Sequence, residues 1–223
     1  MNMDDNIKAF FKNMPVFRNA PAKELARLGS RAKRCEFRKS DFIFQEGDPA
    51  EAAWWVAKGI VKISKLTPDG RMTTMEMLTV GDIFAPSGIM NAPRYPANAI
   101  AVTPASIVKI LRADMVAFVR AYPAVVQDVL EQVRLRVQRS HRLRALDSSS
   151  SAKKVAAVLL WLSEKTGDSV GITRREISEI AGMAPETAVR VILMMKRRQW
   201  VSATARSVTV SNAGALRSFL DKG

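Results

Sequence analysis

Four glycines spaced eleven or twelve residues apart constrain the first half of the chain more than any other feature. They are Gly47, Gly59, Gly70 and Gly81. Short apolar runs lie between and beyond them, for example residues 61–64 and 107–110. Turn residues at such regular intervals are typical of a compact barrel or sandwich. Residues 32–111 are therefore predicted to form an all-β domain.

Helical patterns flank this predicted β-domain. Pro21 is well placed to begin a short helix over residues 22–28, and Pro123 to begin a longer one within residues 112–146. In the longer segment, apolar residues follow a heptad-like spacing: Val126, Leu130, Val133 and Val137. Such a narrow stripe either packs on the β-domain or forms the interface of a homodimer, and the length of the helix favours the dimer.

A run of serines at residues 148–151 interrupts the helical pattern and predicts a domain boundary. The residues that follow indicate one amphipathic helix, two shorter helices and a hairpin near 201–210. The predicted fold class is α+β. We expect an N-terminal domain over residues 1–122, a long helix over 123–147 and a C-terminal domain over 148–223.

The strongest local signal lies at residues 172–200. Thr173 is followed three residues later by Glu176, which matches a capping box that satisfies free amides at a helix start. Gly182 can end that helix in the left-handed conformation, and Pro185 suits the first position of the next helix. Two helices joined by such a short turn predict a helix-turn-helix.

On the second helix of this motif, Glu186 and Arg190 are four residues apart and therefore project from one face. In the DNA major groove, arginine donates two hydrogen bonds to guanine O6 and N7, and glutamate accepts one from cytosine N4. The alternative is a solvated ion pair between the two side chains. The surrounding motif favours base reading.

The charge of the chain agrees with a polyanionic partner. Lysine and arginine number 35 against 21 aspartates and glutamates, a formal net charge of +14. Such a charge suits nucleic acid, although a basic surface can also serve solubility alone. Arg206 lies in the loop of the expected hairpin, where a wing would meet the phosphate backbone.

Scarce cysteine and histidine exclude several classes of site. Cys35 and His141 are the only residues of their types, so we expect no internal disulfide, metal site or catalytic residues. A metal-dependent barrel enzyme of the cupin type is a remote alternative. No apolar run is long enough to cross a membrane, and the N-terminal residues do not resemble a secretory signal. We therefore expect a cytoplasmic protein that is not an enzyme and has no membrane partner.

Over nearly its whole length the chain resembles the CRP/FNR family of bacterial transcription regulators. The resemblance rests on the order and spacing of residues 44–50, 58–62, 70–71, 81–84, 173–177 and 185–190. It implies an N-terminal cyclic-nucleotide-binding-like β-roll, a long dimerisation helix and a C-terminal winged helix-turn-helix. A homodimer would then read a palindrome. Its expected partners are double-stranded DNA, a second copy of the chain and RNA polymerase.

The resemblance also assigns individual residues to DNA contacts. Glu186 and Arg190 match the base-reading pair, together with Val189, which implies a TGA core in each half-site with Arg190 on the guanine. The positions that match phosphate contacts are Thr173, Arg174, Arg175 and Thr187. Pro185 and Val189 depart from the family pattern, so the bases flanking the core are not predicted. Ala184 replaces the usual Ser or Thr cap, at a cost of about 1 kcal/mol.

The cyclic-AMP cassette of the family is not matched. Its Gly-Glu pair aligns with residues 85–86 and its Arg-Ser-Ala run with residues 95–97, so the groups that hold ribose and phosphate are missing. The residues predicted to line a pocket for an unknown small-molecule effector are Trp55, Met75, Ala85, Pro86, Ser87, Gly88, Tyr95, Ala97, Ser140 and His141. Methionine suits an irregular apolar ligand, and equally an ordinary core. We expect gating by an effector other than cyclic AMP, with a constitutive regulator that has lost its ligand as the alternative.

Overall fold

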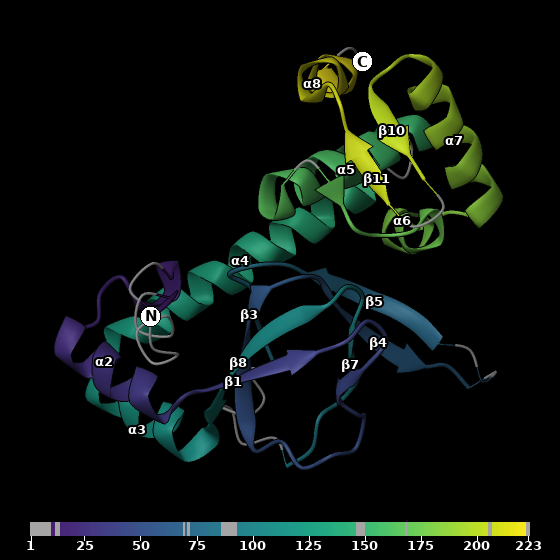
Figure 1. Cartoon of the computed structure of the whole chain (residues 1–223). Helices are drawn as coiled ribbons and strands as arrows, with labels where there is room; N and C mark the ends of the chain where they lie inside the picture. The colour runs from purple at the N-terminus through teal and green to yellow at the C-terminus, as the bar shows by residue number, and fades with distance from the viewer. Residues whose placement is uncertain are drawn as a thin grey trace. The chain divides into compact units, whose positions relative to one another are not determined.

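The computed structural model describes residues 10–11, 14–68, 70, 72–85, 93–145, 150–167, 169–204 and 207–221. The chain forms two compact units, residues 1–137 and 138–223 (Figure 1). Strands and helices occur in both units, which confirms the predicted α+β class. The division falls inside the long helix α4 (Ala124–Ala145). The three domain ranges inferred from the sequence stay a prediction.

The described strands of the first unit form two four-stranded antiparallel sheets. The order in one sheet is β1 (Lys33–Phe37), β8 (Ala105–Leu111), β3 (Ala52–Lys58) and β6 (Ile83–Phe84). The order in the other is β2 (Phe42–Phe44), β7 (Asn98–Ala101), β4 (Val61–Leu66) and β5 (Met72–Leu78). Because the chain crosses repeatedly between the sheets, the two sheets close into a roll, which agrees with the compact barrel or sandwich that the glycine spacing predicts.

The turn at Gly59 shows why the spaced glycines are needed. Gly47, Gly59, Gly70 and Gly81 all have positive φ, between 79° and 91°. At Gly59 an added Cβ would also lie 2.5 Å from the carbonyl oxygen of Pro104. Both the backbone conformation and the close approach of another chain segment therefore exclude a side chain there.

Strand β3 is buried on both faces and supplies two separate cores. Trp54 points into the roll, where it packs with Phe44, Phe84 and other residues between the two sheets. Its neighbour Trp55 is 0% exposed and packs on the opposite face of the strand, in a core that the helices complete. Successive side chains of a strand point to opposite faces, so the two tryptophans serve different cores.

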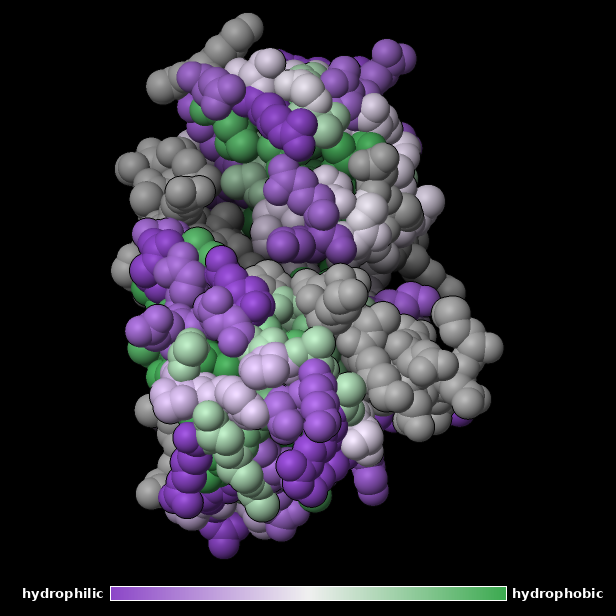
Figure 2. Space-filling view, turned by 90° about the vertical axis from the view of Figure 1, so that its left-hand side faces the viewer, coloured by the Kyte–Doolittle hydropathy of each residue, from purple (hydrophilic) through white to green (hydrophobic). Residues whose placement is uncertain are grey.

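Helices cover the outer face of the sheet that contains β3. They are η1 (Pro15–Phe17), α2 (Ala22–Arg31), α3 (Arg112–Ala121) and the start of α4. Figure 1 places α2 and α3 beside β1 and β8. Helix α2 begins directly after Pro21, as predicted. Figure 2 views this side and shows hydrophilic side chains interspersed with apolar ones over it.

Polar contacts of Asp128 and Arg136 attach α4 to the rest of the first unit. The buried carboxylate of Asp128 accepts two hydrogen bonds of 3.1 Å from Asn19 Nδ2. Two turns further on, Arg136 Nε lies 2.8 Å from Glu76 Oε1 on β5, and Arg136 Nη1 donates a 2.6 Å hydrogen bond to the carbonyl of Ile83. One face of α4 is thereby held against the roll.

The second unit is built from four helices and a three-stranded sheet within its described residues. The helices are α5 (Ser151–Thr166), α6 (Arg174–Ala181), α7 (Pro185–Arg197) and α8 (Ala213–Asp221). The sheet has the order β10 (Val201–Ala203), β11 (Val208–Val210), β9 (Ser169–Val170). Ser150 caps the start of α5, and the expected hairpin near residues 201–210 is present.

We expect Gly59→Ala to destabilise the roll more than Gly81→Ala does. The two glycines have nearly the same φ, but no atom lies within 4 Å of a Cβ added at Gly81. Urea denaturation should show an additional loss of about 1–3 kcal/mol for Gly59→Ala, the usual cost of overpacking. Equal losses in the two variants would contradict the close approach to Pro104.

Candidate nucleic-acid interface

The start of α6 is fixed by the capping box predicted from the sequence. Thr173 Oγ1 accepts a 3.2 Å hydrogen bond from the backbone N–H of Glu176. The Glu176 carboxylate in turn accepts hydrogen bonds from the backbone N–H and the hydroxyl of Thr173, at 2.6 and 2.9 Å. The Thr173 side chain is thus already used by the cap, which leaves its hydroxyl less available to a phosphate.

The turn between α6 and α7 has the geometry of a helix-turn-helix. Gly182 adopts the left-handed conformation, with φ 62° and ψ 45°, and ends α6. The backbone N–H of Met183 donates a 3.0 Å hydrogen bond to the carbonyl of Ser178. Pro185 is the first residue of α7, and its N-cap, Ala184, makes no side-chain hydrogen bond. All of these features agree with the sequence analysis.

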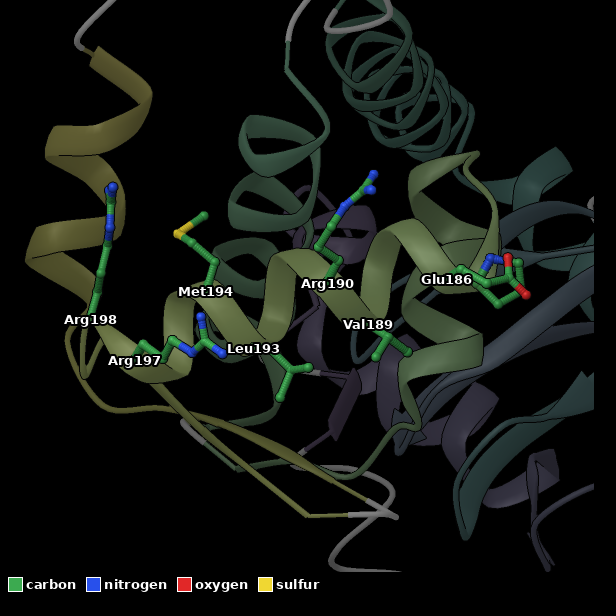
Figure 3. Close-up of a pocket in the computed structure, with 8 residues that line it drawn as sticks. Glu186, Val189, Arg190, Leu193, Met194, Arg197 and Arg198 are labelled. Atoms are coloured by element: carbon green, nitrogen blue, oxygen red, sulfur yellow. The ribbon is translucent and has the colours of Figure 1, made fainter.

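Helix α7 has a buried inner face and an exposed outer face. The inner residues are Ala188, Val191, Ile192 and Met195, all buried. Glu186 and Arg190 lie on the exposed outer face. Within the described part of the chain no ion pair joins these two residues, and Figure 3 shows their charged ends apart. Both groups are therefore free to meet a partner outside the chain.

An open groove of about 650 Å³ follows the outer face of α7 (Figure 3). It is lined by Pro185, Glu186, Val189, Arg190, Leu193, Met194, Arg197 and Arg198. In Figure 3, Arg190 and Met194 leave one flank of the helix, and Val189 and Leu193 leave the other. The groove combines apolar surface with three arginines and one glutamate, which is the chemistry of a DNA-reading surface.

The described residues that are predicted to contact phosphate lie at the starts of α6 and α7, and they differ in how exposed they are. Arg175 is exposed, with its Nε 3.6 Å from Glu179 Oε1. Arg174 is half-buried, and its buried Nε has no hydrogen-bond partner among the residues that the structure describes. Thr187 is half-buried near the start of α7. Arg206 lies outside the described residues.

Leu193 is a member of this surface that the sequence reasoning missed. Its side chain is 42% exposed, although it is large and apolar. Leu193 follows Val189 by four residues, so the two share one helix face. The signal that could have found it is this spacing, once Ile192 and Met195 were assigned to the core.

Two predicted effector-pocket residues differ sharply in exposure. Trp55 has no exposed surface and packs in the helix-side core, because it alternates with Trp54 along β3. Met75 on β5 is 59% exposed on the surface of the roll. Contact of these two residues with an effector stays a prediction. Pro86, Ser87 and Gly88, and the side chains of Ser140 and His141, lie outside the described residues.

Tyr95 fills space inside the roll instead of lining an open pocket. Its ring stacks on Phe44, with 3.8 Å between ring centroids. Its hydroxyl accepts a 3.0 Å hydrogen bond from Trp54 Nε1 and donates one of 3.1 Å to the carbonyl of Ala52. Burial raises the pKa of this phenol, so it stays neutral at physiological pH. Tyr95 is thus fixed in the core.

The remaining effector positions lie at the ends of short strands. Ala97 and Ala85 are both half-buried. The φ of Ala85 is 50°, a left-handed conformation that favours glycine. The backbone here keeps a glycine-like conformation without glycine.

The described residues offer no group of three His, Cys, Asp or Glu side chains that could hold a metal ion. Cys35 is half-buried on β1, and burial raises the pKa of its thiol, which keeps it protonated and unreactive at neutral pH. A search of the described helices for one both long and apolar enough to cross a membrane finds none.

Comparison with known proteins matches both units to described domains. Residues 34–122 match the cyclic nucleotide-binding domain, and residues 153–219 match the Crp-like helix-turn-helix domain. The CRP-like cAMP-activated global transcriptional regulator of Mycobacterium tuberculosis is 23% identical over 90% of this chain and 94% of its own length. The Cyclic AMP receptor protein of Thermus thermophilus is 25% identical over 93% of this chain and 97% of its own length.

Solved structures show the same fold. FixK2 from Bradyrhizobium japonicum is similar with a TM-score of 0.71 at 21% identity, over 84% of this chain and 96% of that one. The c-di-GMP responsive global regulator CLP of Xanthomonas campestris is similar with a TM-score of 0.67 at 17% identity, over 85% and 99%. The chain belongs to the CRP/FNR family of transcription regulators.

Proposed function

We propose that this protein is a homodimeric regulator that reads a DNA palindrome with a TGA core in each half-site. The observation that carries the proposal is the exposed outer face of α7, where Glu186 and Arg190 lie four residues apart with no partner joining them. Arg190 is assigned to the guanine, through its O6 and N7 atoms, and Glu186 to a cytosine N4. The TGA assignment itself comes from the family pattern.

The outer face of α4 supports the dimer. Val126, Leu130 and Val137 are 38%, 61% and 45% exposed, while Val133 is half-buried. Another part of the helix surface is held against the first unit, where Asp128 accepts from Asn19 and Arg136 pairs with Glu76. An apolar stripe that the protomer leaves exposed suits the same stripe of a second copy about a two-fold axis.

Phosphate contacts are assigned to basic residues around the reading helix. Arg174 and Arg175 begin α6, and Thr187 lies in the first turn of α7. Thr173 has a smaller role because its hydroxyl serves the capping box. Arg206 is assigned to the wing loop.

A regulator of this kind works in the cytoplasm without catalysing a reaction, and it is expected to contact RNA polymerase as well as DNA.

The roll interior supports DNA binding that does not depend on cyclic AMP. Two of the relatives above are named for cyclic AMP and one for c-di-GMP, whereas the name of FixK2 mentions no nucleotide. In this chain, the aromatic rings of Phe44, Trp54, Phe84 and Tyr95 pack together in the described part of the interior. This packing favours a second candidate function, a regulator that binds DNA constitutively. The first candidate is gating by an effector other than cyclic AMP.

Arg190→Ala should weaken binding to a TGA palindrome by about 1–3 kcal/mol and relax the preference for guanine. Arg175→Ala is the matched control: it should weaken binding to all sequences alike and lower the slope of log K against log salt by about one. Competition assays with specific and scrambled duplexes at stated salt check both results. Equal losses on both duplexes for Arg190→Ala would contradict its base-reading role.

Leu130→Asp should convert the protein from a dimer to a monomer. The side chain is largely exposed in the protomer, so a charge there leaves the protomer's core intact but must be desolvated in the dimer. Phe42→Asp, at a residue 45% exposed on β2, is the matched control and should stay dimeric. Sedimentation velocity distinguishes the species. A dimeric Leu130→Asp protein would place the interface elsewhere.

A further inference from the structure

The outer face of α7 carries an apolar flank that the base-reading pair does not explain. Val189 is half-buried and Leu193 is 42% exposed. Figure 3 shows both leaving the same flank of the helix, next to the charged row of Glu186 and Arg190. The exposed part of the Leu193 side chain does not contribute to the hydrophobic core of the unit.

The bases of DNA offer one apolar group in the major groove, the C5 methyl of thymine. Most other base-edge groups there are hydrogen-bond donors or acceptors, which an aliphatic side chain would desolvate without compensation, and cytosine has only a hydrogen at C5 in place of the methyl group. A valine and a leucine on a reading helix therefore discriminate in favour of thymine. The groove that holds them also contains Arg190, Arg197 and Arg198 against one glutamate, so its charge suits DNA.

We propose that Val189 and Leu193 read thymine methyl groups in base pairs adjoining the guanine contacted by Arg190. The two residues are four positions apart, about 6 Å along the helix axis. That distance corresponds to roughly two base pairs of DNA. The protein would thus select two thymines about two steps apart. This inference rests on the proposed function, and it supplies the flanking specificity that the family pattern leaves open.

Deoxyuridine tests the proposal directly because it differs from thymidine only by the missing methyl group. The duplex is one enriched by this protein from random sequences, with each thymine replaced in turn. We expect two thymine positions in each half-site to be sensitive. Uracil at either one should weaken binding of the wild-type protein about fourfold, which is the effect of losing one buried methyl-sized group. The other replacements should change binding less than twofold.

The variants assign each methyl to its reader. Val189→Ala and Leu193→Ala should each remove the difference between thymine and uracil at one position and keep it at the other. Leu111→Ala is the matched control, since Leu111 is a leucine 47% exposed in the other unit. The Leu111→Ala protein should keep the difference in binding between thymine and uracil at both positions.

The outcomes separate the inference from the proposed function. Failure to enrich any sequence would overturn the proposed function and the inference with it. A clear TGA palindrome whose thymines all tolerate uracil would overturn the inference alone. So would a Leu193→Ala protein that binds more weakly but retains the full difference between thymine and uracil.

Discussion

The burial of β3 on both faces is the constraint on which the first unit depends. Trp54 and Trp55 are adjacent, and each is surrounded by a different core. The strand therefore needs a second sheet on one side and helices on the other. The N-terminal segment, α3 and the start of α4 supply that helical cover. Because this cover takes only one side of α4, the apolar stripe on its other side is left exposed.

In the second unit, too, one face of a helix is buried in a core and the other face is left exposed. Helix α7 buries Ala188, Ile192 and Met195, which fixes its rotation about its own axis. That rotation determines which residues remain outside. The capping box before α6 and the left-handed Gly182 after it fix the angle of the turn. The outward row of Glu186 and Arg190 is thus a consequence of how the core is packed.

Local signals in the sequence were sufficient for the turns and the helix ends. A capping box, a left-handed glycine and a proline at a helix start are decided by neighbours within four residues, so Thr173, Gly182 and Pro185 could be placed. The side of the sheet that each tryptophan occupies depends on distant segments, so the burial of Trp55 in the helix-side core could not be predicted. Leu193 was missed for a related reason, since its exposure is defined only once the core face of α7 is known. The effector positions depend on loops whose course a pattern of residues does not determine.

The most direct test of the central claim is selection from random DNA duplexes by the full-length protein without any added effector, at a stated salt concentration. The account predicts enrichment of a palindrome with two TGA half-sites one helical turn apart, about 34 Å between centres. Salt-sensitive binding without an enriched sequence would contradict sequence-specific binding by the free protein, because contacts to phosphate alone carry no sequence information.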